Sequence, residues 1–531
     1  MNMSQLKHLD FRTITLASLS GIMLTAAFPR TGFDYFAWFA LVPLILTINQ
    51  TKAVFLTGCL TGFIHQITLV YWLVTAMHVY GNLPIFTSVP LLILLCMYLS
   101  IFTGIFCVLV KRLCPRPWQL IWAPFIWVSL EYARSLTQFA FPWELLGYSQ
   151  YLKLPLIQIA DITGVYGISW LIVLFNVAIA CFLLYTTRQF WNQIEVSNRL
   201  VYVFLGSVIF CFVVFLSYGL VRMYGINKTI QTSQNQMKVG IVQGNINQAV
   251  KWDEKFRLQT IQKYILASLS ENHHDADLIV WPETAVPIYI QQETPLRKKL
   301  ISFIDNQSAV LLIGGLRYDR SVLGRWLFYN SAYLLEPNKS DWQTYDKSHL
   351  VPYGEYIPFQ TVFPFLSKFV QGVGNFSAGT SIVPLKWDKW EIGPQICYEI
   401  LFPTISRKLV QKGADVLVNI TNDAWYGYSS APYQHFSMIV FRAVENKRAL
   451  ARSANTGISG FVNPYGKIIS ASKIFTDANL NASLPILNDL TFYCQFGDVF
   501  AISCCLVLFI VVLLSFFLRK DHFKQHDVVQ I

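Results

Sequence analysis

Apolar residues run in long segments through the first 222 residues and again near the end of the chain. A helix that crosses a bilayer needs about 20 mostly apolar residues. Eight segments have this character, and each predicts a transmembrane helix: 11–28, 34–50, 53–75, 87–110, 118–133, 164–186, 200–222 and 496–518. The fifth is the shortest and contains Glu131.

The stretch between the seventh and eighth apolar segments has ordinary polar composition. Short β-rich runs that end in polar residues recur in it, at 237–243, 278–281, 310–314, 326–335, 392–397 and 416–420. Helical patterns lie between them, as at 254–270 and 404–412. We therefore expect a membrane domain over residues 1–223, an inserted α/β domain over 224–493, and a last transmembrane helix with a tail over 494–531.

The composition agrees with a membrane protein. Hydrophobic residues make up 54% of the 531 residues and charged residues only 13%, against about 25% in an average globular domain. The net charge of +11 is not gathered into one basic stripe, which argues against nucleic-acid binding. Most cysteines lie in or beside apolar segments, and only Cys397 lies deep inside the polar stretch, which excludes a disulfide scaffold. The histidines show no metal-ligand spacing, so we expect neither a metal nor a cofactor.

Basic residues in the short loops predict the orientation. If the eight segments alternate, most of these residues fall on one side, with minor exceptions at Arg30, Arg134 and Lys153. The residues on that side are Lys7, Arg12, Lys52, Lys111, Arg112, Arg116, Arg188, Arg199, Arg519, Lys520 and Lys524. Both termini are therefore expected in the cytoplasm, and the large domain on the opposite side of the membrane.

Three fragments place a reactive side chain after an apolar run. The first fragment, Leu-Ile-Val-Trp-Pro-Glu, ends at Glu283. The second, Tyr-Asp-Lys-Ser-His-Leu-Val-Pro-Tyr-Gly-Glu, contains Lys347 and Glu355. The third, Gln-Ile-Cys-Tyr-Glu, contains Cys397. Functional groups converge at strand ends in α/β folds. A carboxylate that takes the thiol proton, and an ammonium that lowers the thiol pKa and stabilises an oxyanion, would make a nucleophilic site.

These fragments resemble the nitrilase (carbon-nitrogen hydrolase) superfamily, and most closely its membrane-embedded members, the apolipoprotein N-acyltransferases. The resemblance covers essentially the whole chain. Further matching stretches are Phe-Pro-Trp-Glu-Leu-Leu-Gly-Tyr-Ser-Gln at 141–150, Val-Gln-Gly-Asn-Ile at 242–246, Lys-Trp-Asp at 251–253, Thr-Asn-Asp-Ala-Trp-Tyr-Gly at 421–427 and Asn-Thr-Gly-Ile-Ser at 455–459. The resemblance implies a nitrilase-like αββα sandwich inserted before the last of eight transmembrane helices.

The resemblance also implies residue roles. Glu283 would be the general base, Lys347 the stabiliser of the transition state and Cys397 the nucleophile, with Glu355 as an accessory carboxylate. The N–H of Tyr398 would serve the oxyanion, and the side chains of Tyr398 and Glu399 would support the site. Taken singly, each fragment has a simpler interpretation, because a lone cysteine is usually a small buried hydrophobe and a lone lysine is usually solvated.

Substrate contacts are expected at four aromatic residues. Trp252 matches a family tryptophan near the acyl pocket, and Trp143 another on the membrane side, although interface-belt tryptophans are common at membrane boundaries. The apolar stretch 362–376, with Phe365 and Phe369, is expected either to pack as a loop or to act as a lid that dips into the bilayer surface.

The family implies a two-step transfer in a bacterial inner membrane, with the catalytic domain in the periplasm. Cys397 would take the sn-1 acyl chain of a phospholipid as a thioester and pass it to the N-terminal amino group of diacylglyceryl-cysteine on an apolipoprotein, the last step of lipoprotein maturation. One alternative is a membrane-anchored nitrilase or amidase that hydrolyses a small C–N bond. Another is a transporter or receptor with an inactive nitrilase-like domain, although few polar residues in the spans support it. Nothing indicates an obligate partner chain, and we expect a monomer.

Overall fold

The computed structural model describes residues 9–136, 140–356 and 375–527. The chain divides into two compact units. The helical unit contains the residues up to Tyr71, Leu91–Leu220 and the residues from Asp498 onward, and the sandwich unit contains Trp72–Pro90 and Val221–Gly497. The sandwich unit thus includes a segment that the sequence places among the membrane helices. The domain boundaries expected at 223 and 493 stay a prediction.

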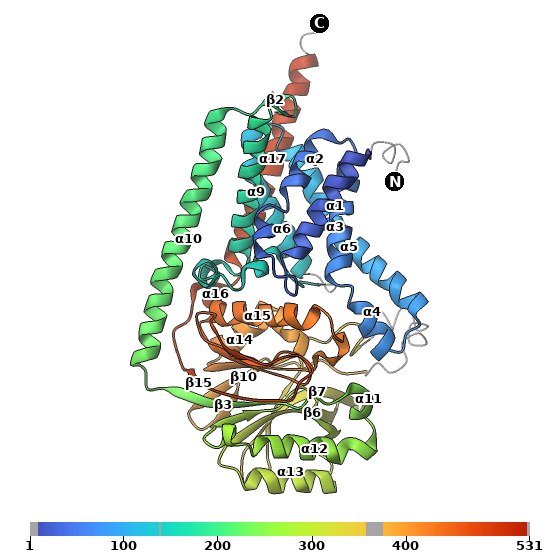
Figure 1. Ribbon diagram of the computed structural model, residues 1–531, viewed down its shortest axis with the longest axis vertical. Helices are drawn as coiled ribbons and strands as arrows, with labels where there is room; N and C mark the ends of the chain where they lie inside the picture. The colour runs from blue at the N-terminus through green and yellow to red at the C-terminus, as the bar shows by residue number, and fades with distance from the viewer. Residues whose placement is uncertain (1–8, 137–139, 357–374, 528–531) are drawn as a thin grey trace. The chain divides into compact units, whose positions relative to one another are not determined.

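Apolar helices correspond to the eight expected segments, although several are short or broken (Figure 1). Their bounds are α1 Phe11–Ala26, α2 Val42–Gln50, α3 Val54–Leu69, α5 Ile85–Leu113, α6 Ala123–Leu136, α9 Tyr166–Thr186, α10 Asn198–Thr232 and α17 Val499–Asp527. Within the described part of the chain, four helices are long and apolar enough to cross a membrane, namely α5, α9, α10 and α17. A fifth results if α3 and Leu73–Tyr80, which are bent by 57°, form one span. The expected number of eight spans stays a prediction.

Two of the expected spans are interrupted for a visible reason. The segment 34–50 begins with a 3-10 turn, Asp34–Trp38, and its α-helix α2 starts only at Val42 with a proline in its first turn. The segment 118–133 begins with another 3-10 turn, Pro117–Trp122, before α6. Proline fits the first turn of a helix but not its interior, so it marks where each regular helix can start.

Small residues let the helices of the helical unit approach closely. A Cβ atom on Gly58 of α3 would lie 2.6 Å from the backbone oxygen of Thr103 in α5, and one on Gly62 would lie 2.9 Å from the Cα atom of Ser100. The hydroxyl of Thr61 donates to the backbone oxygen of Ala17 in α1 at 3.0 Å. Backbone-to-backbone contact of this kind is how helices associate in lipid.

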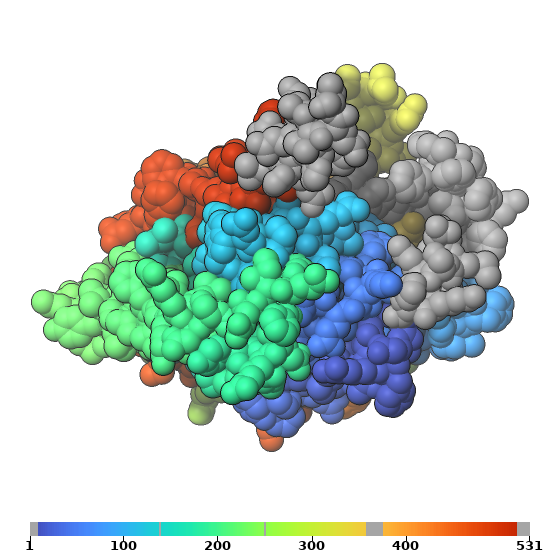
Figure 2. Space-filling model, turned by 90° about the horizontal axis from the view of Figure 1, so that it is seen from above, coloured from blue at the N-terminus to red at the C-terminus, as the bar shows by residue number. Residues whose placement is uncertain are grey.

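Helix α10 leaves a long apolar surface uncovered. Tyr202, Ile209, Phe210 and Val221 on this helix are all exposed, and Figure 2 shows the green side chains of this region open to view. A helix in water buries such a face against its neighbours, whereas a helix in a bilayer presents it to lipid. The exposed face therefore agrees with a membrane protein.

Two β-sheets form the core of the sandwich unit. One sheet has the order β14-β13-β12-β11-β10-β9 and the other has the order β15-β3-β4-β6-β7-β8, with β5 also paired to β6. The strands of the first sheet are β9 Leu385–Trp387, β10 Trp390–Ile396, β11 Val416–Thr421, β12 Ala449–Ala454, β13 Gly460–Val462 and β14 Ile468–Ala471. Those of the second are β3 Gln236–Gln243, β4 Leu278–Val280, β5 Val286–Tyr289, β6 Val310–Arg320, β7 Trp326–Leu335, β8 Gln343–Asp346 and β15 Ala478–Pro485.

Helices cover the outer faces of both sheets, so the unit is an αββα sandwich, as the resemblance implies (Figure 1). Helices α12 (Glu254–Ser268) and α13 (Pro295–Asp305) lie on the second sheet, and α14 (Pro403–Gln411) and α15 (Ala431–Asn446) lie on the first. Strand β10 runs parallel to β11, and β11 runs parallel to β12. Likewise β3, β4 and β6 are parallel neighbours. Parallel neighbours bring their carboxyl ends to the same edge, where side chains after the strands can meet.

The segment that joins the sandwich unit from the N-terminal half packs on the loop after β11. The indole of Trp72 donates to Gln434 Oε1 of α15 at 3.2 Å, and its ring lies 4.7 Å from that of Tyr426. The ring of Tyr80 lies 5.8 Å from that of Trp425. Hydropathy alone assigned residue 72 to a membrane span, but its contacts are those of a domain residue.

Candidate active site

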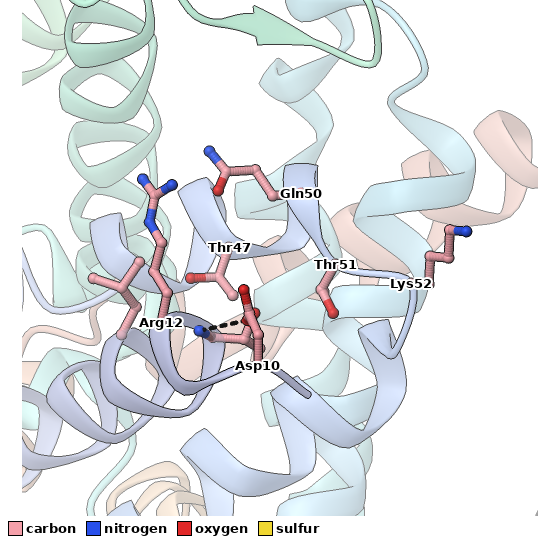
Figure 3. Close-up of a pocket in the computed structure, with 8 residues that line it drawn as sticks. Asp10, Arg12, Thr47, Gln50, Thr51 and Lys52 are labelled. Atoms are coloured by element: carbon pink, nitrogen blue, oxygen red, sulfur yellow. Dashed lines mark hydrogen bonds between the residues drawn. The ribbon is translucent and has the colours of Figure 1, made fainter. Parts of the chain in front are cut away.

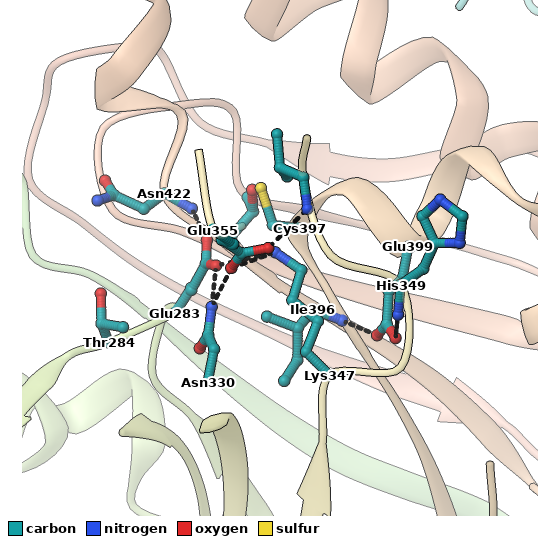
Figure 4. A network of polar contacts seen from close by, with 12 residues as sticks. Glu283, Thr284, Asn330, Lys347, His349, Glu355, Ile396, Cys397, Glu399 and Asn422 are labelled. Carbon is teal, nitrogen blue, oxygen red and sulfur yellow. Dashed lines mark hydrogen bonds and ion pairs between the residues drawn. The ribbon is translucent and has the colours of Figure 1, made fainter. Parts of the chain in front are cut away.

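The turns after three strands bring the sequence-predicted residues Glu283, Lys347 and Cys397 together. Strand β10 ends at Ile396, directly before Cys397, which starts a 3-10 turn with a positive φ of 52°. Glu283 follows β4, and Lys347 follows β8 directly. Figure 4 shows the sulfur of Cys397 beside the carboxylates of Glu283 and Glu355 and the ammonium of Lys347. A non-glycine residue held at positive φ is strained, which is common where a functional group must be aimed.

The turn that carries Glu283 requires a glycine on the neighbouring strand. A Cβ atom on Gly314 of β6 would lie 2.6 Å from the Cα atom of Glu283. The turn itself is strained, because Thr284 has a positive φ of 47° although it is β-branched. The absence of a side chain at 314 therefore fixes how closely Glu283 approaches the sheet.

Lys347 is an almost fully buried ammonium between two carboxylates. Its Nζ lies 2.9 Å from Glu355 Oε1 and 3.5 Å from Glu283 Oε1. Burial alone would lower the pKa of Lys347, but the charges of Glu355 and Glu283 outweigh it and raise the pKa above its usual range. The lysine therefore stays charged throughout the physiological range.

Asn330 of β7 holds the two carboxylates in place. Its Nδ2 donates to Glu283 Oε1 at 2.7 Å and to Glu355 Oε1 at 2.9 Å, and its backbone oxygen accepts from the N–H of Lys347 at 2.9 Å. The second oxygen of Glu283 accepts from the N–H of Asn422 at 2.9 Å. Asn330 is not among the residues that the sequence predicts in the site. One feature of the sequence points to Asn330: it is an asparagine inside the β-rich run 326–335, and asparagine is uncommon in strands.

The surroundings of Cys397 raise the pKa of its thiol. Burial and the charge of Glu283 raise its pKa well above the ordinary value, and the opposing charge of Lys347 is too weak to reverse them. The charge of Lys347 lowers the thiol pKa, as expected from the sequence, but burial and the charge of Glu283 outweigh this effect. A neutral thiol must give up its proton during attack, and of the carboxylates whose charges act on it Glu283 has the largest effect.

Comparisons with known proteins agree with this geometry. Residues 20–178 match the family model described as the apolipoprotein N-acyltransferase N-terminal domain, and residues 238–483 match the carbon-nitrogen hydrolase model. A protein of Geobacter metallireducens named apolipoprotein N-acyltransferase is 39% identical over 96% of this chain and 96% of its own length. One of the same name from Rickettsia prowazekii is 32% identical over 94% of this chain and 96% of its own length.

The chain belongs to the apolipoprotein N-acyltransferase family. The resemblance found in the sequence is thereby confirmed. Among solved structures, a Saccharomyces cerevisiae member of branch 10 of the nitrilase superfamily is 18% identical, with a TM-score of 0.37 over 47% of this chain and 90% of its own. An amidase from Nesterenkonia is also 18% identical, with a TM-score of 0.36 over 49% of this chain and 92% of its own.

In this member of the family, Glu399 joins the lysine loop to the nucleophile turn. Its Oε1 accepts from the N–H of Ser348 at 2.7 Å and from the hydroxyl of Tyr345 at 3.0 Å, and its Oε2 accepts from the N–H of Ile396 at 2.8 Å. Burial raises the pKa of Glu399. A fully buried carboxyl group with this many donors is an anchor between two loops.

The remaining predicted residues differ in their surroundings. Tyr398 is buried, with its ring 5.3 Å from that of Phe402. Trp252 is 42% exposed, and Trp143 is buried with its ring stacked 6.1 Å from Phe141. Phe365 and Phe369 lie outside the described residues, so the expected lid stays a prediction.

Lys251, in the family stretch Lys-Trp-Asp, is a second buried lysine beside the base. Its Nζ donates to the backbone oxygen of Glu283 at 3.1 Å and to Thr284 Oγ1 at 2.5 Å. Burial lowers the pKa of Lys251 to about 8. In the sequence, Lys251 stands out only as part of the Lys-Trp-Asp stretch that carries the family resemblance.

A pocket of about 220 Å³ in the helical unit is unrelated to these groups (Figure 3). Its lining residues are Asp10, Arg12, Thr13, Leu16, Thr47, Gln50, Thr51 and Lys52. None of the predicted site residues that the structure describes lines it.

Proposed function

We propose that this chain transfers an acyl chain from a phospholipid to the N-terminal amino group of a diacylated apolipoprotein, through a thioester on Cys397. The observation that supports this most is the convergence of Cys397, Glu283 and Lys347 on one buried centre, in a chain of this family with long apolar helices.

In the first step Cys397 attacks the ester carbonyl of the phospholipid at its sn-1 position. Glu283 takes the thiol proton as the carbon–sulfur bond forms. The ammonium of Lys347 and the N–H of Tyr398 stabilise the oxyanion. When the carbon–oxygen bond breaks, Glu283 returns the proton to the departing oxygen, and a lysophospholipid leaves.

In the second step the amino group of diacylglyceryl-cysteine attacks the thioester. Glu283 takes the amine proton, the amide bond forms, and the Cys397 thiolate leaves and is protonated again. Bound substrates in one membrane plane gain proximity, and a dry site protects the thioester from hydrolysis. Trp252, Trp143, Phe365 and Phe369 are proposed to contact the acyl chains.

The other residues support these groups. Glu355 pairs with the ammonium of Lys347, and Glu399 joins the loop after Lys347 to the turn that carries Cys397. We place the chain as a monomer in a bacterial inner membrane, with both termini in the cytoplasm and the sandwich unit in the periplasm. Reaction of a single cysteine introduced at exposed Val322 with a membrane-impermeant maleimide would test this orientation, because only a periplasmic position is labelled in intact cells.

The alternative is hydrolysis of a small C–N bond, because the same three groups serve both reactions. The decisive test mixes the purified full chain with phospholipid and a diacylated lipopeptide and follows both by mass spectrometry. Acyl transfer predicts a triacylated peptide and a lysophospholipid in equal amounts. Release of free fatty acid without triacylated peptide, or turnover of small amides instead, would reject the transferase.

A further inference from the structure

Four buried polar side chains lie behind the turn that carries Cys397. They come from four different elements, and each is 0% exposed: Asn419 of β11, Asp423 of the 3-10 turn Asp423–Tyr426, His435 of α15 and Arg452 of β12. Polar groups this deeply buried cost folding free energy unless they are fully paired. The catalytic steps described above use none of them.

His435 holds the backbone oxygen of the nucleophile. Its Nε2 lies 3.3 Å from the backbone oxygen of Cys397, and because a carbonyl can only accept, Nε2 carries the hydrogen. The Nδ1 atom of the same ring lies 2.9 Å from Arg452 Nη2, which can donate to it. Burial and the positive charge of Arg452 lower the pKa of His435.

Arg452 fixes both side chains that reach this carbonyl. One of its Nη atoms donates to Asn419 Oδ1, and the amide nitrogen of Asn419 lies 3.5 Å from the backbone oxygen of Cys397. The other donates to Asp423 Oδ2 at 2.8 Å, while Asp423 Oδ1 lies 3.0 Å from His435 Nδ1. Burial alone would raise the pKa of Asp423, but the charges of Arg452 and His435 lower it to about 2. Arg452 and Asp423 therefore form an ion pair that lies against Nδ1 of the imidazole.

The orientation of this carbonyl sets that of the next N–H. The peptide bond is planar and trans, so the backbone oxygen of Cys397 and the N–H of Tyr398 point in opposite directions from one rigid plane. Holding the oxygen toward His435 therefore aims the N–H of Tyr398 away from it. A hydrogen bond to the oxygen also polarises that N–H and strengthens it as a donor.

We propose that His435 is a positioning residue of the oxyanion site, which holds the Cys397 carbonyl so that the N–H of Tyr398 meets the developing oxyanion. The proposal rests on the proposed function for the role of Tyr398. A purely structural role of His435 would affect every reaction of the Cys397 sulfur. The proposed role affects only reactions with acyl groups, because only these form an oxyanion.

Two substitutions separate the two ring nitrogens. In His435→Gln the amide nitrogen reaches about as far as Nε2 and keeps a donor for the Cys397 oxygen. In His435→Asn the amide nitrogen reaches only as far as Nδ1, so no donor meets the Cys397 oxygen. We expect thioester formation on Cys397 to fall about 10- to 100-fold in His435→Asn, as for a weakened oxyanion donor, and by less than about fivefold in His435→Gln.

The readouts are acylation of Cys397 by p-nitrophenyl butyrate and by phospholipid, and alkylation of Cys397 by iodoacetamide. Alkylation forms no oxyanion, so it is expected to stay within about twofold of the unchanged protein in both variants. An equal fall in alkylation and acylation, or unchanged acylation in His435→Asn, would overturn the proposal. If the ester acylates the unchanged protein but phospholipid does not, the proposed function fails and this inference does not.

A measurement on the unchanged protein covers the case in which the variants do not fold. The ¹⁵N resonances of His435 in the full chain report which ring nitrogen carries hydrogen. A hydrogen on Nε2 supports the proposal, and a hydrogen on Nδ1 alone contradicts it.

Discussion

The ammonium of Lys347 lies closer to Glu355 than to Glu283, at 2.9 Å against 3.5 Å. Glu355 therefore takes the stronger ion pair, and Glu283 keeps an oxygen that can accept a proton. Of the two carboxylates beside Lys347, Glu355 thus anchors the lysine and Glu283 is left to act as the base.

Replacing Glu355 by Gln is expected to disturb this division. Lys347 would then pair with Glu283 alone and make it a weaker base. Losing one charged hydrogen bond of this type lowers the rate of thioester formation by about 10- to 100-fold. The check is the rate of acyl-enzyme formation with phospholipid, and a rate equal to that of the unchanged protein would show that Glu355 does not position Lys347.

Replacing Glu283 by Gln removes the proposed base and keeps its shape. Because burial and the charge of Glu283 raise the pKa of the Cys397 thiol, attack requires a base that takes the thiol proton. We expect thioester formation to fall about 100- to 10,000-fold, the usual contribution of general base catalysis. A rapid reaction in this variant at pH 7 would mean that the thiol is ionised without Glu283.

Adjacent glycines provide a matched pair for the placement of Glu283. In Gly314→Ala the new Cβ meets backbone, 2.6 Å from the Cα atom of Glu283, and the turn must move. In Gly315→Ala it meets Cδ1 of Ile290 at 2.7 Å, the far end of a flexible side chain. We expect Gly314→Ala to lose most acyl transfer and about 1–3 kcal/mol of stability, and Gly315→Ala to lose less of both. Equal losses would show that the close approach at 314 has no special role.

Lys251 predicts a pH dependence of stability. Burial lowers its pKa from 10.5 to about 8, so between these values the unfolded chain binds more protons than the folded one. Stability gained from this group therefore rises with pH from about 8 to 10.5. The Tm of the unchanged protein should therefore rise relative to the Tm of Lys251→Met as the pH increases from about 8 to 10.5. Exposed Lys298→Met is the control, and parallel Tm curves for the unchanged protein and Lys251→Met would contradict the assignment.

The sequence was sufficient for six strands, β3, β4, β6, β7, β10 and β11, and for the meeting of Glu283, Lys347 and Cys397, but it did not predict β5, β8, β9, β12, β13, β14 and β15. Glu283 and Cys397 each follow an apolar run, whereas Lys347 follows the polar strand β8, so only the resemblance identified Lys347. Asn330 and His435 were not found, because a polar residue inside a strand or helix shows its partners only when the chain is folded. The net pKa of Cys397 was also beyond the sequence, since it depends on how deeply the sulfur is buried.

Hydropathy was a less complete guide to the helices. It located the apolar segments but not the 3-10 turns at Asp34 and Pro117, because an average over about 20 residues does not register a short break. It also placed Trp72 in a span, whereas the indole pairs with Gln434 in the sandwich unit. A hydrogen bond across 362 positions of sequence separation leaves no trace in local periodicity.

The central claim is that Cys397 carries the acyl chain, and mass spectrometry tests it directly. The purified full chain is incubated with a phospholipid of known acyl composition, digested, and searched for a peptide bearing that acyl group on Cys397. The account predicts a hydroxylamine-sensitive thioester there, absent from Cys397→Ala and not formed by Cys397→Ser, and lost when a diacylated lipopeptide is added. Transfer to the lipopeptide at an undiminished rate in Cys397→Ala would contradict it.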